Sequence, residues 1–203
     1  MTRRARESDY QPGHDCLKES ILKAWRAWVV LSFLLLSGCL VTFKEPIPAN
    51  EAAPIPLLGV WSRVDEWGEL RYLDITRSGS NLYKADTYVD NPDNMPSVQS
   101  YSFTVAHHGR RWYLSAGVPK RLGANFAIGG FELTQAGELV LFNLDVERIR
   151  EAIASGEING SDVNMPQGGV LVTSKLDKVF AYLNDPANSD LFVEVARYQR
   201  SAP

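Results

Sequence analysis

Short apolar runs with alternating polar positions, separated by turn residues, fill the chain from Leu57 to Leu144. In Val98–His107, for example, an aromatic or aliphatic residue alternates with serine or threonine, which is the pattern of a half-buried strand. The other predicted strands here are Leu57–Arg63, Leu70–Thr76, Leu82–Val89, Arg111–Ala116, Asn125–Leu133 and Leu139–Leu144. Such strands, joined by tight turns, predict an antiparallel meander that forms a barrel or a strongly curved sheet.

The apolar period changes to a helical one after Leu144. Asp145 is a predicted N-cap for a helix that ends near Gly156. A second helix is predicted between the capping pattern Ser174-x-x-Asp177 and Asn184. The remaining predicted strands are Val170–Thr173 and Leu191–Tyr198. The predicted fold class is therefore mainly β (α+β), with two short helices near the C-terminus.

The N-terminal region has the layout of a secretory signal peptide. The apolar segment 27–36 follows basic residues and ends in Leu36, Ser37, Gly38 and Cys39. These four residues resemble the lipobox of bacterial lipoproteins. The resemblance implies cleavage after Gly38 and a lipid anchor on Cys39, with several acyl chains giving stable membrane attachment.

The same resemblance implies a periplasm-facing location in the cell envelope. Leu40, and not an aspartate, follows the cysteine, which favours the outer membrane if the host has one. The alternative is an uncleaved signal anchor, because the uncharged stretch Ala27–Phe43 is 17 residues long and at the lower limit for spanning a bilayer. Both interpretations place residues 44–203 outside the cytoplasm.

The predicted organisation has three parts: a signal peptide at 1–38, a lipidated cysteine with a tether at 39–56, and one globular β-rich domain at 57–200. Four prolines lie between Leu40 and Leu57, and proline fixes φ and removes a backbone donor. We expect this tether to be extended or disordered and to act as a semi-rigid spacer that lifts the domain off the lipid surface.

Charge and cysteine content narrow the function classes. The formal net charge is −3, and segment 1–38 carries more basic than acidic residues, so the mature part is the more acidic one. An acidic domain argues against non-specific nucleic-acid binding. The two cysteines are Cys16 and Cys39, so a lipidated mature chain has no thiol left for a disulfide.

Candidate catalytic and metal-binding residues are few. His107 and His108 are adjacent on a predicted strand, so their rings point to opposite faces and make poor joint ligands. The chain contains no Gly-x-Ser-x-Gly elbow, and its oxygen-rich loops do not match a calcium loop. We therefore expect no catalytic site, no metal and no cofactor, with an envelope hydrolase based on His107 or His108 as the weakest alternative.

The segment Gly59-Val60-Trp61 weakly resembles the Gly-x-Trp that opens lipocalin-like barrels. The resemblance implies that Trp61 closes the barrel base with an arginine of the last strand packed over it. Arg197 is the predicted partner and Arg200 the alternative. Two features depart from the lipocalin pattern. The Thr-Asp-Tyr turn of lipocalins is missing, and the predicted helices precede the final strand instead of following it. The layout also resembles small envelope lipoproteins, a resemblance that implies no activity.

The leading hypothesis is a non-enzymatic envelope lipoprotein whose domain binds a small apolar ligand or a protein partner. It depends on the anchor and on the many strand aromatics, which either fill the core or line an apolar pocket. A structural or assembly protein is the alternative, acting through an exposed sheet edge or an apolar patch.

Overall fold

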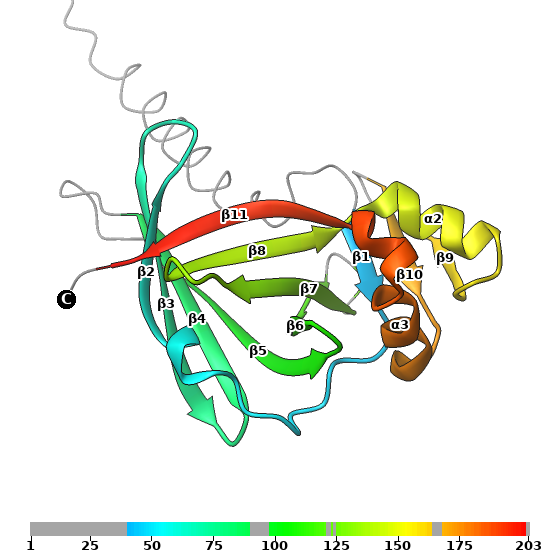
Figure 1. The fold of residues 1–203 in the computed structure, drawn as a ribbon, viewed down its shortest axis with the longest axis horizontal. Helices are drawn as coiled ribbons and strands as arrows, with labels where there is room; N and C mark the ends of the chain where they lie inside the picture. The colour runs from blue at the N-terminus through cyan, green and yellow to red at the C-terminus, as the bar shows by residue number, and fades with distance from the viewer. Residues whose placement is uncertain (1–39, 90–97, 121–122, 124, 164–167, 202–203) are drawn as a thin grey trace, which may run out of the picture. The chain divides into compact units, whose positions relative to one another are not determined.

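The computed structural model describes residues 40–89, 98–120, 123, 125–163 and 168–201. Eight antiparallel strands form a closed barrel (Figure 1). They are β2 (Gly59–Val64), β3 (Leu70–Gly79), β4 (Leu82–Val89), β5 (Gln99–His108), β6 (Arg111–Gly117), β7 (Phe126–Leu133), β8 (Glu138–Leu144) and β11 (Phe192–Arg200). The meander closes because β11 pairs with both β8 and β2. The prediction of a mainly β, barrel-like fold is confirmed.

A smaller layer gathers beside the barrel where β8 ends and β11 begins (Figure 1). It contains β1 (Leu40–Phe43), α2 (Val146–Ala154), β9 (Gly160–Asp162), β10 (Gly169–Val172) and α3 (Leu176–Leu183), followed by the 3₁₀ segment η4 (Pro186–Leu191). Strand β1 pairs in parallel with β10 along its whole length and meets β7 at Phe43 and Phe126. The sheet therefore continues from the barrel wall into this layer.

The segment between Cys39 and Leu57 is part of the folded domain, so the prediction of a spacer there is wrong. Phe43 is 2% exposed and Ile47 is 1% exposed. The Ile47 carbonyl accepts a hydrogen bond from Thr104 Oγ1 at 2.6 Å, and the Ala53 amide donates to the Tyr83 hydroxyl at 2.8 Å. The segment contains a turn and a 3₁₀ helix, and it is packed along β5 and around the end of the barrel. We call residues 44–57 the strap.

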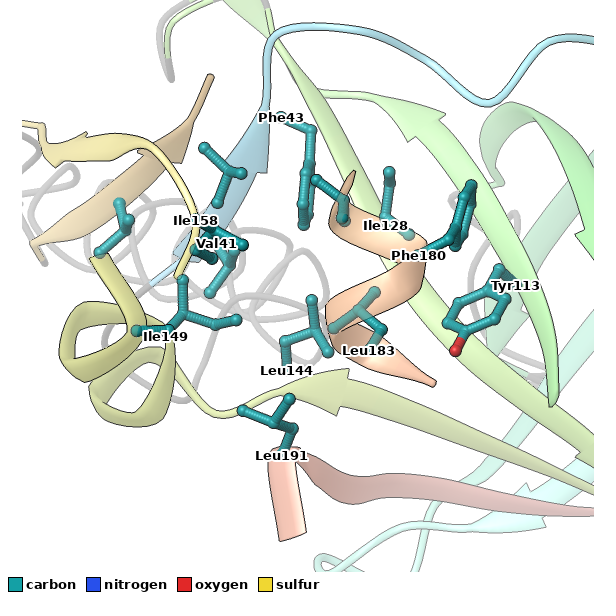
Figure 2. Close-up of a cluster of buried hydrophobic side chains, with 14 of the residues drawn as sticks. Val41, Phe43, Tyr113, Ile128, Leu144, Ile149, Ile158, Phe180, Leu183 and Leu191 are labelled. Atoms are coloured by element: carbon teal, nitrogen blue, oxygen red, sulfur yellow. The ribbon is translucent and has the colours of Figure 1, made fainter. Parts of the chain in front are cut away.

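Two hydrophobic cores hold these layers together. One fills part of the barrel and is built from inward-facing residues such as Trp61, Phe103 and Phe131. The other lies outside the barrel, where α2, α3 and β1 pack their apolar faces on its wall (Figure 2). Phe180 of α3 meets the Tyr113 ring of β6 edge-on, at a centroid distance of 5.1 Å. The strand aromatics are thus divided between an interior and an exterior core.

Both predicted helices form, but only one is capped as expected. The Asp145 side chain accepts hydrogen bonds from the Glu147 and Arg148 amides at the start of α2. Helix α3 begins after Lys175 with no side-chain cap, so the predicted capping pattern at Ser174 is wrong. The Ser174 hydroxyl instead accepts a hydrogen bond from the Asn159 amide at 2.7 Å, which joins β10 to the turn before β9.

Candidate functional site

The barrel has two different ends. At the end where β2 starts, three short hairpins join β3 to β4, β5 to β6 and β7 to β8. The 3₁₀ segment η2 (Ile55–Leu57) of the strap lies against the barrel core at this end, through Leu57. We call this the sealed end. At the opposite end, which we call the open end, β2 stops at Val64, β4 at Val89 and β6 at Gly117, and longer connections follow.

Trp61 and Arg200 close the sealed end. Trp61 is 2% exposed, and its Nε1 donates to the Leu57 carbonyl at 2.9 Å. The Arg200 guanidinium lies 4.1 Å from the centre of the Trp61 ring and donates to the carbonyls of Leu58 and Pro56. A Cβ on Gly59 would lie 2.7 Å from Arg200 Nη1, and its φ of +111° also favours glycine.

Arg200, and not Arg197, is therefore the arginine over Trp61, so the choice of Arg197 is corrected. Arg197 lies on the outer face and pairs with Glu194 and Glu138, which raises the pKa of its guanidinium. The cause is a β-bulge between Glu194 and Ala196, where β11 shifts register against β8. An extra residue in a strand reverses which positions face inward.

The inward-facing side chains are buried at some positions and half-buried at others. Trp61, Val105 and Leu139 are buried. The strand register continues this inner face to positions that are only half-buried: Arg63, Ala85, Thr87, Gln99, Tyr101, Leu114, Ala116, Ala127, Leu141 and Asn143. Many of them are small or aliphatic. The inner face is therefore only partly buried at these positions.

Two arginines face each other on the inner surface at this end. Arg63 on β2 is the cross-strand partner of Arg71 on β3. Arg71 is buried and donates from Nε to Asp65 Oδ2 at 2.5 Å and from Nη2 to Glu69 Oε2 at 3.1 Å. The Arg63 guanidinium lies 5.3 Å from the centre of the Tyr198 ring. The open end therefore combines a small apolar wall with guanidinium groups.

Asp65 organises the β2–β3 turn beside these arginines. Its side chain is fully buried, and Oδ1 accepts the amides of Trp67 and Glu69, both at 2.9 Å. Burial alone would raise the pKa of this carboxyl, but the hydrogen bonds from Arg71 and the two amides lower it below its ordinary value. Asp65 is thus a structural anion that holds the turn together.

The sequence interpretation missed Arg63, Arg71 and Asp65 as a group. A signal was present, because Trp61 and Arg63 lie two residues apart on β2, as do Arg71 and Leu73 on β3. Residues two apart in a strand share a face. The arginines therefore lie on the same faces as the apolar residues of their strands. This spacing could have predicted that both arginines face inward.

The two histidines are separated, as their adjacency on a strand predicted. The His107 ring lies 4.9 Å from Trp112, and the His107 amide donates to the Glu51 carboxylate. The His108 ring stacks on Phe180 at 3.8 Å, on the other face of β5. Within the described part of the chain, neither imidazole hydrogen-bonds to a serine or a carboxylate. This arrangement gives the hydrolase alternative no support.

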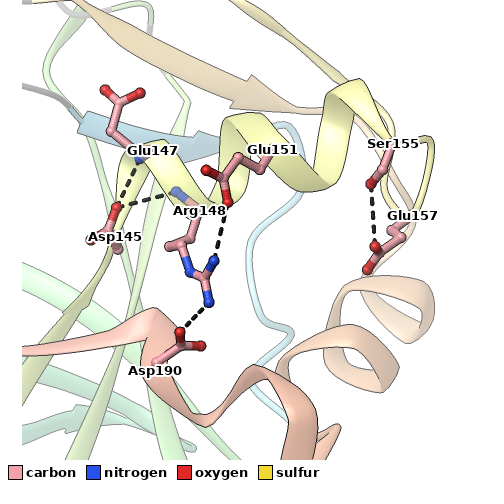
Figure 3. A network of polar contacts seen from close by, with 7 residues as sticks. All are labelled: Asp145, Glu147, Arg148, Glu151, Ser155, Glu157 and Asp190. Atoms are coloured by element: carbon pink, nitrogen blue, oxygen red, sulfur yellow. Dashed lines mark hydrogen bonds and ion pairs between the residues drawn. The ribbon is translucent and has the colours of Figure 1, made fainter.

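A surface pocket of about 230 Å³ lies between α2 and η4. Arg148 spans it by pairing with Glu151 at 3.2 Å and with Asp190 (Figure 3). Tyr182 also lines this pocket, and burial, followed by the charge of Glu157, raises the pKa of its hydroxyl. The charged groups hold α2 against η4, and as exposed pairs they contribute little to stability.

Several sequence predictions lie outside the described residues. They are the apolar segment 27–36, the lipobox residues Leu36, Ser37 and Gly38, and the lipidated Cys39. Among the described residues, no helix has the length and apolar character needed to cross a bilayer. In that same part of the chain, no group of three or more His, Cys, Asp or Glu side chains could hold a metal ion.

Comparison of the chain with protein-family models, with curated proteins and with solved structures gave no match.

Proposed function

We propose that the barrel is a binding module that takes one small, mainly apolar ligand through its open end. The observation that supports this is that small residues on the inner face near the open end, such as Ala116 and Ala127, are only half-buried. Ligand sites are concave and mostly apolar, with a few placed polar groups. The open end has both components, since Arg63 and Tyr101 share the inner face with alanines and leucines.

The module acts at the lipid surface of the cell envelope, anchored through Cys39. Strand β1 begins at Leu40, so no spacer separates the anchor from the domain, whose second residue, Val41, is already buried. The supporting sequence feature is the lipobox-like segment 36–39. Cys39→Ser should abolish incorporation of labelled palmitate into the full chain, while Cys16→Ser should leave it unchanged. Undiminished labelling of Cys39→Ser would refute the anchor.

Binding through the open end can be tested by filling it. We expect the full chain in detergent-free lipid nanodiscs to bind octan-1-ol or octanoate by calorimetry, with empty nanodiscs as the blank. Ala116→Phe and Ala127→Phe place a phenyl ring on the inner face at the open end and should each abolish binding of both compounds. Ala136→Phe, in the exposed β7–β8 turn at the sealed end, is the matched control and should bind normally.

The outcome of this titration decides between the hypotheses. Loss of binding in both inner variants, with unchanged thermal midpoints, supports the module. Absence of binding of either compound to the wild-type chain contradicts it and leaves the structural or assembly alternative.

A further inference from the structure

The β2–β3 hairpin carries apolar and aromatic residues on its outer face. Val64 and Leu70 are cross-strand partners beside the turn, and they are 65% and 37% exposed. Trp67 lies in the turn itself and is 55% exposed. Two residues after Leu70, on the same face, Tyr72 is paired with Tyr88 of β4, and the two rings stack with centroids 5.1 Å apart. We call these five residues the tip patch.

The composition of the tip patch suits the boundary between lipid and water. Single exposed apolar residues are common on protein surfaces, whereas a group of them marks an interaction site. Tryptophan and tyrosine are enriched at membrane–water interfaces, because their rings are apolar and carry one polar group. The turn of this hairpin also projects past β11, at the top of Figure 1. The tip patch therefore lies on a protruding part of the domain.

The charged groups of the turn are compatible with a shallow lipid contact. The carboxylates of Asp65 and Glu69 both bind the Arg71 guanidinium, and the Asp65 side chain is fully buried. Glu66 is exposed in the turn. Because an ionised group is costly to remove from water, Glu66 limits the insertion of the turn to the depth of the lipid head groups.

The place where the folded chain begins identifies lipid as the surface that meets the tip patch. Strand β1 starts at Leu40, directly after Cys39, and consecutive Cα atoms are only about 3.8 Å apart. With an anchor on Cys39, the domain has to lie on the lipid surface. In Figure 1, β1 starts on the upper side of the domain and runs down to the strap, so the hairpin turn and the anchored end lie on the same side.

We propose that the tip patch inserts into the head-group region of the membrane, as a second contact beside the acyl chains on Cys39. This inference rests on the proposed lipid anchor and adds an orientation to it. Several acyl chains already give stable attachment, so the hairpin sets how the barrel stands on the lipid. The lipid is zwitterionic, because Glu66 and Glu69 are repelled by an anionic surface.

Quenching of tryptophan fluorescence by brominated lipid tests this contact. The full chain is placed in nanodiscs of phosphatidylcholine, or of phosphatidylcholine with bromine on its acyl chains near the head group. Bromine quenches a tryptophan only at short range. The difference in emission between wild type and Trp67→Phe isolates Trp67, whatever the state of Trp25 and Trp28. We expect this difference to be smaller in the brominated lipid.

A tryptophan at the opposite end of the barrel is the matched control. Ile55 is 83% exposed and lies in η2 at the sealed end. Ile55→Trp, made in the Trp67→Phe chain, should add emission that is the same in both lipids. Thermal midpoints show that the variants are folded. Trp67→Phe keeps the backbone amide that donates to Asp65, so the turn should be retained.

Each outcome decides the inference. No quenching of Trp67, or equal quenching at position 55, overturns it. Protection of Trp67 from acrylamide without quenching by brominated lipid shows that a second copy of the chain covers the tip patch, which also overturns it.

Palmitate labelling of Cys39→Ser tests the anchor separately. An anchor at Cys39 with an unquenched Trp67 leaves the anchor standing and removes the hairpin contact. A quenched Trp67 in a chain without label supports the hairpin contact and removes the anchor.

Discussion

Replacing Arg200 with methionine tests the closure of the sealed end. The Arg200 guanidinium donates to the carbonyl of Pro56 in the strap and to that of Leu58 just after it, and it lies over Trp61. Arg200→Met removes the charge and the hydrogen bonds but keeps an apolar stem that can cover the indole.

The magnitude follows from these contacts. Arg200 is exposed, so each hydrogen bond to a carbonyl is discounted to about 1 kcal/mol, and the cation–π contact at an exposed site is worth about 0.5–1 kcal/mol. The sum is about 2–3 kcal/mol. For a domain of this size, that corresponds to a fall in the thermal midpoint of roughly 5–10 °C.

Thermal unfolding followed by circular dichroism measures this loss, with Arg197→Met as the matched control. Arg197 lies three residues earlier on the same strand and makes only exposed ion pairs, so its replacement should leave the midpoint nearly unchanged. An equal or larger fall in Arg197→Met would refute the assignment of Arg200 as the closing residue.

Two further predictions concern the buried ion pair and strand β1. The folded-state pKa of Asp65 is lowered, so the ionised carboxylate stabilises the fold fully above the ordinary pKa of about 3.9. This stabilisation is lost as the pH falls from there towards the folded-state pKa. In urea unfolding, the stability of Asp65→Asn should therefore depend less on pH below about 4 than that of wild type. Phe43→Ala should lower the free energy of unfolding by about 3–5 kcal/mol in urea titrations, because a 2% exposed ring is removed from the outer core. The control is Lys44→Ala, which replaces an exposed side chain and should have little effect. Equally small effects of both replacements would restore the spacer interpretation.

The barrel strands could be predicted because their side chains alternate on a surface that is buried on one side. In β5, Phe103 and Val105 face the core while Ser102 is exposed, and this is a local, period-two signal. The same holds for α2, where Asp145 and the spacing of its apolar residues mark the start and the buried face.

Strand β1 could not be predicted in this way. Its four residues directly follow Cys39 and precede a proline-rich stretch, and they carry no alternation. They become a strand through a parallel pairing with β10, about 130 residues further along the chain; for example, Thr42 Oγ1 donates to the Val170 carbonyl at 3.1 Å. A pairing over that separation leaves no local pattern in the sequence.

The face of β11 was assigned wrongly for a related reason. Strict alternation from Leu191 keeps odd positions on one face, but the bulge shifts the inner face to Ala196, Tyr198 and Arg200. A bulge depends on the partner strand, so the sequence of β11 alone does not reveal it. Asp65 was missed because only the folded turn brings it to Arg71.

Access to the barrel interior is the central claim, and ligand protection of an introduced thiol tests it most directly. In a Cys16→Ser, Cys39→Ser background, Ala116→Cys places a thiol on the inner face at the open end, and Ala136→Cys places one in an exposed turn outside the barrel. We predict that both thiols react with a small charged thiol reagent and that octanoate slows only the reaction at position 116. A thiol at position 116 that does not react, or that reacts at the same rate with and without octanoate, would contradict the account.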